Sequence, residues 1–348
     1  MSFPKAIRNP DAVYFIAEAG VNHNGDLDLA FELIDAAANA GADAVKFQTL
    51  DADRLVTEEA PKATYQQRAT DSGSQHEMIR QYELGKDEHA QLIERCARND
   101  ITFLSTPFDP ESANLLDDFD VPMLKIGSGE LDNHPFLEHV AGFGRSLIVS
   151  TGMATMEEVE NAYDLIRSVD STLDLALLHC TSEYPTTHAN TNLRAMQIMD
   201  ETFPVPVGHS DHTPDIETPS FAAAAGAAIV EKHFTMDRTL PGPDHEFALE
   251  PDGLARAVSL ARNAATARGS PVKRPTSGEM ELRELSRKGL HARRDLEPGD
   301  TLTEEVISIK RPATGISPAH LSAVLDKQVQ SPIEGGEPIR WETLETEQ

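Results

Sequence analysis

The stretch Val13-Tyr14-Phe15-Ile16-Ala17-Glu18-Ala19-Gly20 is almost entirely apolar, and a second such stretch, Ala44-Val45-Lys46-Phe47-Gln48-Thr49-Leu50, follows it closely. Apolar runs of this length are typical of parallel strands that are buried on both faces. Between the two runs, residues 27–40 place apolar side chains at roughly helical spacing and end before Gly41. The region therefore predicts a buried strand, a helix and a second buried strand.

The same alternation recurs along most of the chain. Six further apolar runs occupy residues 101–108, 123–130, 146–153, 175–184, 205–213 and 228–235. Helical patterns occupy residues 88–99, 155–169, 190–201, 216–225 and 252–267. Eight strands with helical connections of this length predict the α/β class and, within it, a (β/α)8 TIM barrel.

The alternation of apolar runs and helical patterns ends at Gly269. Residues 270–285 contain Pro271, Pro275 and Gly278, which predicts a linker. Residues 286–348 contain short β-like pieces separated by turns rich in Gly and Pro, which predicts a small, mostly β domain. We therefore expect a barrel domain over 1–269, a linker over 270–285 and a second domain over 286–348.

One connection in the predicted barrel is unusually long. Residues 51–85, between the second strand and its helix, are largely polar. A loop of this length in a compact domain is usually functional, often as a lid over a site. Its residues Tyr65, Gln66, Gln75 and His76 either reach a substrate or lie in a solvated loop, and both interpretations are open.

Composition limits the kinds of partner. The 348-residue chain carries 58 acidic and 30 basic residues, a formal charge of −28. We expect no nucleic-acid partner, because phosphate binding needs a basic face. No stretch approaches the roughly 20 apolar residues that cross a bilayer, and the N-terminus lacks a secretory pattern, so we expect a cytoplasmic protein without membrane contact. The acidic surface suits an enzyme of concentrated salt, where self-repulsion is screened.

Polar side chains follow the predicted strands, at the barrel end where active sites gather. Lysine inside an apolar strand is costly unless it meets an anion, and Lys46 and Lys125 lie in such strands. We expect both to hold a phosphate and a carboxylate, together with hydroxyl groups at other strand ends: Thr106, Ser128, Ser150 and Ser210. In the alternative, each lysine pairs with a barrel glutamate such as Glu18 or Glu130.

Two histidines end neighbouring predicted strands. His212 and His233 are candidates to share one divalent cation, and neutral imidazoles suit manganese, iron, cobalt or zinc better than calcium. The alternative for each ring alone is a hydrogen-bonded core residue. Cys96 and Cys180 have no metal-ligand spacing and are expected to be reduced core residues.

These segments, taken in order, resemble the sialic acid synthases. The motifs that carry the resemblance lie at residues 16–25, 45–49, 103–109, 125–130 (Lys-Ile-Gly-Ser-Gly-Glu), 150–153, 179–181, 184–185, 210–213 and 231–235 (Glu-Lys-His-Phe-Thr). Residues 310–316 resemble the signature of that family's C-terminal antifreeze-like (SAF, β-clip) domain. The resemblance runs from about residue 14 to about residue 339, and it implies a TIM barrel followed by a SAF domain.

The family's chemistry follows from the same resemblance. It implies that phosphoenolpyruvate and water react with the open-chain aldehyde of N-acetylmannosamine to give N-acetylneuraminate and phosphate, with cleavage of the C–O bond of phosphoenolpyruvate. It implies a homodimer with a swapped C-terminal domain, and a divalent metal, manganese before magnesium or cobalt. Lys46 and Lys125 would orient phosphoenolpyruvate, and Glu130 would transfer a proton near the aldehyde.

Matching the motifs position by position assigns ligands. The positions matching those that hold phosphoenolpyruvate are Glu18, Lys46, Thr106, Lys125, Ser128, Ser150 and Ser210. The positions matching those near the sugar are Gln48, Glu130, Tyr184 and Asp244, with Arg311 reaching the site from the other subunit, and the metal positions are His212 and His233. Ser182 departs from the family, which often has Asn there, and this leaves the exact sugar open.

Three other functions are weighed against this one. A legionaminate or pseudaminate synthase performs the same chemistry on a 2,4-diacetamido sugar. A heptulosonate or octulosonate phosphate synthase uses a phosphorylated aldose, and the C-terminal domain argues against it. A non-catalytic sugar-binding protein belongs to another class and would release no phosphate with any sugar.

Overall fold

The computed structural model describes residues 3–70 and 72–344. The chain forms two compact units, residues 1–269 and 270–348. In the first unit, eight parallel strands follow the order β3-β2-β1-β8-β7-β6-β5-β4, and β3 also contacts β4. The strands are β1 Tyr14–Gly20, β2 Ala44–Thr49, β3 Thr102–Pro107, β4 Met123–Ile126, β5 Ser146–Ser150, β6 Leu175–Cys180, β7 Val207–Asp211 and β8 Ile229–His233.

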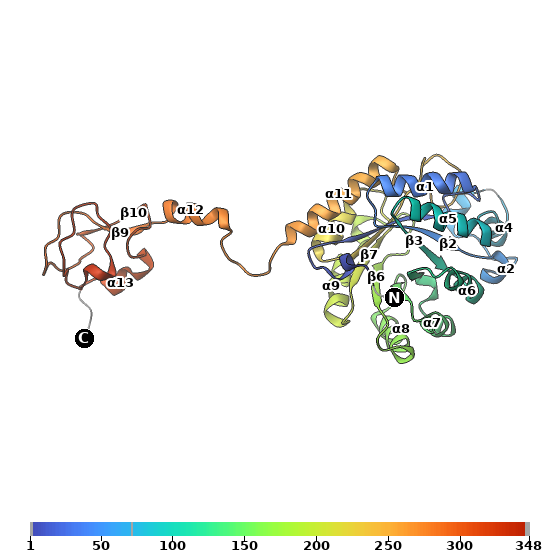
Figure 1. Ribbon diagram of the computed structural model, residues 1–348, viewed down its shortest axis with the longest axis horizontal. Coiled ribbons are helices and arrows are strands. Elements are labelled where there is room, and N and C mark those ends of the chain that lie inside the picture. Colours follow the sequence, from blue (N-terminus) through green and yellow to red (C-terminus); the bar gives the residue numbers. More distant parts are fainter. Residues whose placement is uncertain (1–2, 71, 345–348) are drawn as a thin grey trace. The chain divides into compact units, whose positions relative to one another are not determined.

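Helices surround these strands, as Figure 1 shows. They are α1 Leu27–Asn39, α5 Lys86–Arg98, α6 Pro110–Asp118, α7 His134–Ala141, α8 Met156–Val169, α9 Leu193–Thr202, α10 Thr218–Ala225 and α11 Pro251–Arg268. The predicted (β/α)8 barrel is confirmed. The sequence reading omitted α6 and α7, although Asp109, which caps α6 by accepting from the backbone of Ser112, precedes a proline in the first turn.

The barrel interior changes from apolar to polar along each strand. Tyr14 and Ile16 belong to an apolar cluster inside the barrel, and Glu18, two residues further on, lines a cavity. Because side chains alternate between the two faces of a strand, residues at i and i+2 share a face. On β2 the same face carries Ala44 and then Lys46. One end of the barrel interior is therefore a packed plug, and the other end presents functional groups.

The long connection after β2 is folded rather than extended. It contains three short helices, α2 Ala52–Leu55, α3 Thr64–Ala69 and α4 Gln75–Arg80. Met78, Ile79 and Tyr82 pack with Val21 and Leu50, which belong to the loops that follow β1 and β2. The connection therefore has a small apolar core of its own above the barrel.

The second unit has a separate core. Strands β9 Gly289–Ala292 and β10 Ile307–Lys310 pair antiparallel, and apolar side chains of this unit pack around them. The predicted linker over 270–285 is wrong in one respect, because helix α12 occupies Ser277–Ser286. Thr276 and Glu279 form its capping box, a signal that the Pro- and Gly-rich composition obscured.

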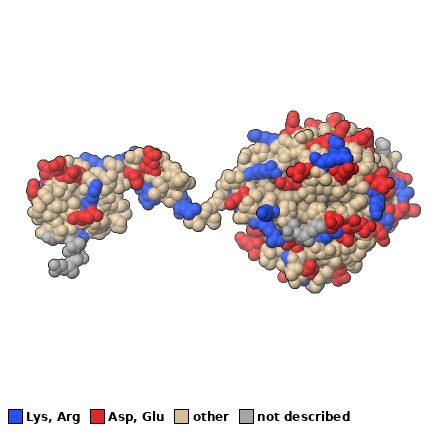
Figure 2. All heavy atoms as spheres, viewed as in Figure 1, with Lys and Arg blue, Asp and Glu red and all other residues tan. Residues whose placement is uncertain are grey.

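The surface shows how charged side chains are distributed and whether any helix could span a membrane. On the face drawn in Figure 2, Asp and Glu side chains are spread over both units with Lys and Arg among them, and they do not form a single patch. No helix in the described ranges is both long and apolar enough to cross a membrane.

Candidate active site

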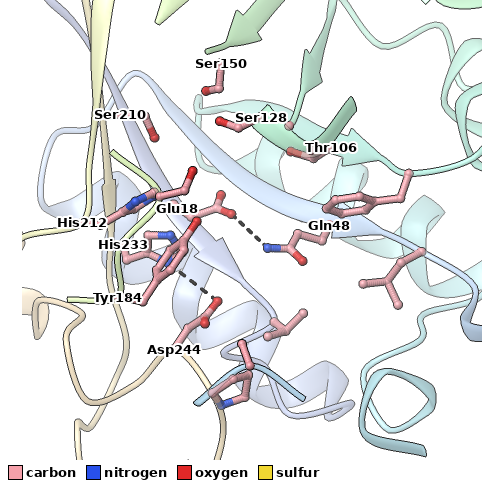
Figure 3. A pocket seen from close by; sticks show the side chains of 18 of the residues that line it. Glu18, Gln48, Thr106, Ser128, Ser150, Tyr184, Ser210, His212, His233 and Asp244 are labelled. Carbon is pink, nitrogen blue, oxygen red and sulfur yellow. Dashed lines mark hydrogen bonds and ion pairs between the residues drawn. The ribbon is translucent and has the colours of Figure 1, made fainter. Parts of the chain in front are cut away.

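The polar end of the barrel opens into a cavity of about 610 Å³, to which all eight strands contribute. Figure 3 shows the cavity with its hydroxyl, imidazole and carboxylate side chains turned toward a common space. The predicted site residues that line it are Glu18, Lys46, Gln48, Thr106, Lys125, Ser128, Ser150, Tyr184, Ser210, His212, His233 and Asp244. Residues far apart in sequence thus meet at one place.

Lys46 is buried at the centre of this arrangement. Its ammonium group lies 2.8 Å from Oε2 of Glu18 and 3.7 Å from Oε1 of Glu231, and it donates to the hydroxyl of Thr106 at 2.9 Å. Burial lowers the pKa of Lys46, but the two carboxylates outweigh burial and hold its pKa above the usual value. Burial raises the pKa of Glu18 to about 7, against the opposing effect of Lys46. Lys46 is therefore charged, and Glu18 titrates near neutrality.

Lys125 is held mainly by neutral groups. Its ammonium donates to the hydroxyl of Ser150 at 2.6 Å and to the carbonyl oxygen of Ile126 at 3.1 Å, whereas Oε2 of Glu231 lies 3.9 Å away. Burial lowers the pKa of Lys125. The pairing of lysines with barrel glutamates thus holds at short distance for Lys46, whereas Lys125 reaches the Glu231 carboxylate only at 3.9 Å. An incoming anion would find this ammonium without first breaking a short ion pair.

Glu231 is a site residue that the sequence reading did not assign. It lies on β8 between the two lysines, and its Oε1 also accepts from the hydroxyl of Ser210 at 3.2 Å. Burial raises its pKa, but Lys125 and Lys46 outweigh burial and lower it below the usual value. Its position in the sequence could have predicted this place, because Glu231 lies two residues before His233 on β8 and both side chains therefore point to the same face of the strand.

Glu130 lies next to the cavity lining, and its predicted proton transfer stays a prediction. The predicted strand over 123–130 ends at Ile126, and a 3-10 turn, Ser128–Glu130, follows. The turn directs Ser128 into the cavity, but Glu130 is absent from the described lining residues and accepts a hydrogen bond from Asn133 at 2.7 Å instead. Strand alternation no longer applies once the ladder ends, so the direction of the Glu130 side chain follows from the turn and not from the strand.

His212 and His233 face the same cavity, with ring centroids 5.4 Å apart. Nδ1 of His212 lies 2.8 Å from the carbonyl oxygen of Thr181, which can only accept, so Nδ1 carries the proton and Nε2 is free to act as a ligand. Nδ1 of His233 is buried without a hydrogen-bond partner and lies 3.8 Å from Oδ2 of Asp244. These two rings fit two ligands of a cation, although no group of three or more metal-binding side chains occurs among the described residues.

Aromatic rings and a carboxyl group surround the other end of the cavity. The ring of Tyr184 lies 4.2 Å from that of His212 and stacks at 5.0 Å on Tyr65, which α3 supplies. Burial raises the pKa of Asp244 to about 6. Of the open candidates in the long connection, Tyr65, Gln66 and Gln75 line the cavity. His76 does not, and its Nε2 lies 2.7 Å from Asp53 instead.

The expectations for the two cysteines and for Arg311 have different outcomes. Cys96 and Cys180 are both free and buried, but Cys180 lines the cavity and is not only a core residue. Arg311 is exposed in the second unit, directly after β10, and is not among the described lining residues of the cavity. Its predicted contact with the sugar stays a prediction.

Comparison with known proteins identifies the family. Residues 33–273 match the NeuB family and residues 287–345 match the SAF domain. The chain belongs to the NeuB family. Two NeuB-type relatives are N,N'-diacetyllegionaminic acid synthases. The protein of Legionella pneumophila is 44% identical over 336 residues, covering 95% of this chain and 94% of that one, and the protein of Campylobacter jejuni is 41% identical over 314 residues, covering 90% and 94%.

A solved structure agrees with this assignment. The crystal structure of the N-acetylneuraminic acid (sialic acid) synthetase from Leptospira borgpetersenii in complex with citrate has a TM-score of 0.70 and 37% sequence identity. The match covers 78% of this chain and 90% of that one. The resemblance to sialic acid synthases read from the motifs is confirmed, and this NeuB-family chain is an enzyme of nonulosonic acid synthesis.

Proposed function

We propose that this enzyme condenses phosphoenolpyruvate and water with the open-chain aldehyde of an acetamido sugar. The methylene carbon bonds to the aldehyde carbon, water adds to C2 of phosphoenolpyruvate, and phosphate leaves with cleavage of the C–O bond. The observation that carries the proposal is the pair of buried ammonium groups, Lys46 and Lys125, among the hydroxyl groups of Thr106 and Ser150. Lys46 is paired with Glu18, whereas Lys125 donates at short distance only to neutral oxygens, and two buried cations among hydroxyl groups suit a small ligand that carries both a phosphate and a carboxylate.

The sugar is proposed from the relatives. N-acetylmannosamine is the substrate that the motifs suggest. The relatives at 44% and 41% identity are named for N,N'-diacetyllegionaminic acid, which supports a 2,4-diacetamido sugar instead. Both sugars present an aldehyde and an acetamido group, so the same cavity chemistry serves either one. Of the two, we favour the diacetamido sugar.

The lysines and carboxyl groups have distinct tasks in this reaction. Lys46 and Lys125 hold the phosphate and carboxylate so that the methylene carbon approaches the aldehyde carbon, and such orientation contributes up to about 7–11 kcal/mol in well-aligned systems. Glu18, whose pKa is raised to about 7, is suited to carry a proton at neutral pH. In Figure 3, Tyr184 and Asp244 lie toward the opposite end of the cavity from Ser150. They are proposed to contact the sugar.

A divalent metal is proposed as the cofactor. His212 and His233 would hold it, and the buried, unpartnered Nδ1 of His233 supports a ligand at this point. A bound cation of this kind supplies Lewis acidity where negative charge develops on oxygen. The donor set suits manganese or cobalt, with the remaining ligands coming from water or substrate. A homodimer in which Arg311 completes the sugar site is proposed on the family resemblance.

Phosphate release tests the proposal. The enzyme is incubated with phosphoenolpyruvate, manganese and either N-acetylmannosamine or its 2,4-diacetamido analogue, in low and in high salt. We expect sugar-dependent phosphate release, with Lys125→Met lowering kcat/KM for phosphoenolpyruvate at least ~100-fold because the substrate anion loses a buried cation. Lys86→Met is the control, since Lys86 is exposed on α5. Absence of phosphate release with every sugar would rule out the proposed reaction.

A further inference from the structure

The loop between β8 and α11 forms part of the cavity wall beside Tyr184. Residues 235–248, here called the Asp244 loop, supply Pro243 and Asp244 to the cavity lining. The ring of Phe247, in the same loop, lies 5.5 Å from that of Tyr184 and 5.1 Å from that of His233. The conformation of this loop therefore sets the position of Asp244 beside the other residues of the cavity.

The base of the Asp244 loop is closed by backbone hydrogen bonds. The backbone of Leu249 donates to the carbonyl oxygen of His233 at 3.0 Å, and the backbone of Thr235 donates to that of Leu249 at 2.8 Å. Every residue of the loop is described, and none of them belongs to a helix or a strand. A loop of this kind is held by its closed ends and by its own side chains. The place of Asp244, far from the base, therefore depends on side-chain contacts.

His245 joins the Asp244 loop to the loop that follows β1. Its Nε2 lies 3.2 Å from Oδ1 of Asn24, and its Nδ1 lies 2.6 Å from the hydroxyl of Thr235. Because Oδ1 can only accept, Nε2 carries the proton and donates to Asn24, and Nδ1 accepts from Thr235. Burial lowers the pKa of His245 to about 4, so the neutral ring that these bonds require is the form present at neutral pH. Both nitrogens of a buried ring are thus bound.

The backbone around the contact between Asn24 and His245 has special conformations. Asn24 has a φ of 52°, in the left-handed region that asparagine adopts more readily than most residues. Gly242 has a φ of 147°, and a Cβ atom there would lie 2.8 Å from Cδ2 of His245 and 2.9 Å from Oδ1 of Asn24. Only glycine allows the backbone to approach the hydrogen bond so closely. None of these three residues is among the described residues that line the cavity.

We propose that His245 is a positioning residue for the sugar: by joining Asn24 to Thr235 it holds the Asp244 loop in place. Asp244 directly precedes His245, so a displacement of the imidazole ring also displaces the carboxyl group that is proposed to contact the sugar. The inference rests on the proposed function, because it takes Asp244 as part of the sugar site. The two lysines lie on β2 and β4, outside this loop, so binding of phosphoenolpyruvate should not depend on His245.

The test is a difference between the two substrates. His245→Leu removes both hydrogen bonds, Asn24→Gly removes one acceptor and still permits the left-handed backbone, and His245→Gln keeps a donor toward Asn24. His139→Leu is the matched control, since Nε2 of His139 lies 2.9 Å from Oδ1 of Asn114, but on α7 and outside the described cavity lining. Phosphate release is measured with manganese, varying either phosphoenolpyruvate or the better of the two acetamido sugars.

His245→Leu and Asn24→Gly should each raise KM for the sugar ~10-fold or more and change KM for phosphoenolpyruvate less than ~3-fold. His245→Gln should stay within ~3-fold of the wild type for both substrates, because the bond to Asn24 is kept. His139→Leu should change neither KM. A purely structural role of His245 would instead lower the fraction of active enzyme, and with it kcat, and leave both KM values unchanged.

A double variant shows whether His245 acts through Asp244. Asp244→Asn alone should raise KM for the sugar, and adding His245→Leu should raise it less than ~3-fold further, because the carboxylate that His245 positions is already lost. Unchanged KM for the sugar in folded His245→Leu and Asn24→Gly, an equal rise for both substrates, or full additivity with Asp244→Asn would overturn the inference and leave the proposed function standing. Absence of phosphate release by the wild type with every sugar would overturn the proposed function, and the inference with it.

Discussion

The ammonium group of Lys232 lies 2.6 Å from Oδ2 of Asp211, and both side chains are buried. Lys232 also donates to the hydroxyl of Thr213 at 3.1 Å. Lys232 directly precedes His233 on β8, and Asp211, the last residue of β7, directly precedes His212. Because side chains alternate between the two faces of a strand, the ion pair lies on the outer face and the two histidines lie on the cavity face. The pair therefore ties together the two strand ends that carry the candidate metal ligands.

Removing one member of this pair should be strongly destabilising. Lys232→Met leaves the Asp211 carboxylate buried without its cation, and breaking a buried pair in this way costs about 3–5 kcal/mol. Urea unfolding measures this loss in the free energy of unfolding. Arg98→Met is the control, because the Arg98–Glu94 pair is exposed and worth at most about 1 kcal/mol. Replacing both members, as Lys232→Met with Asp211→Leu, should restore much of the stability, and a double variant no better than the single one would contradict this account.

Replacing Glu231 and Glu130 separately tests which of the two carboxylates the reaction needs. Glu231→Gln removes the carboxylate between the lysines, and we expect kcat/KM for phosphoenolpyruvate to fall ~100-fold or more because the ammonium groups lose the charge that balances them. Glu130→Gln should change kcat/KM less than ~5-fold, because Glu130 is not among the described residues that line the cavity and its carboxylate already accepts from Asn133. Steady-state phosphate release measures both. A severe loss in Glu130→Gln with a mild one in Glu231→Gln would reverse this assignment.

Chelation tests the two candidate metal ligands. After treatment with EDTA and removal of the chelator, phosphate release should fall at least ~10-fold and recover when manganese is added. Titration calorimetry with manganese alone should show binding to the wild-type protein and none to His212→Ala or His233→Ala. His139→Ala is the control, since His139 lies on α7 and bonds Asn114. Undiminished activity after chelation would exclude a required metal.

Buried neutral histidines should make the fold sensitive to acid. Burial lowers the pKa of His23 from 6.5 to about 4. Above pH 6.5 the imidazole is neutral in both states, so its lowered pKa does not affect the free energy of unfolding. As the pH falls from 6.5 to 4, only the unfolded chain takes up the proton, and the free energy of unfolding decreases. For His23 alone the loss between pH 7.5 and pH 5 is about 2 kcal/mol.

Replacing that histidine isolates its share of the acid sensitivity. Burial likewise lowers the pKa of His209 and of His245 to about 4, so the wild-type loss is larger than that of His23 alone. His23→Asn should reduce the difference in unfolding free energy between pH 7.5 and pH 5 by about 2 kcal/mol, whatever its effect at pH 7.5. Equal pH dependence in wild type and variant would show that folding does not lower the pKa of His23.

The charge of −28 predicts a dependence on salt. Exposed charges repel over about 10 Å at 0.1 M ionic strength but over only about 3 Å at 1 M. The free energy of unfolding should therefore rise between 0.1 M and 2 M KCl, as measured by thermal or urea unfolding. The same free energy at both concentrations would remove the halophilic interpretation of the acidic surface.

Much of the active site could be predicted from the order of residues. Lys46, Gln48, Ser210 and His233 were placed correctly because each lies on a regular strand, where alternation fixes the face that a side chain takes. Alternation could not place Glu130, because it lies beyond the end of β4 in a 3-10 turn, where its carboxylate accepts from Asn133. Position along a chain predicts direction only while the backbone remains in a repeating conformation.

The sequence by itself determined the eight-stranded barrel, the family and the set of polar side chains at the strand ends, because hydrophobic periodicity and motif order are local properties of the chain. Only the tertiary structure decided that Glu231 lies between the two lysines and that apolar residues of the long connection line the same cavity. These relationships join residues from distant segments. Their distances arise only when the barrel closes and buries its apolar surface, which no local pattern encodes.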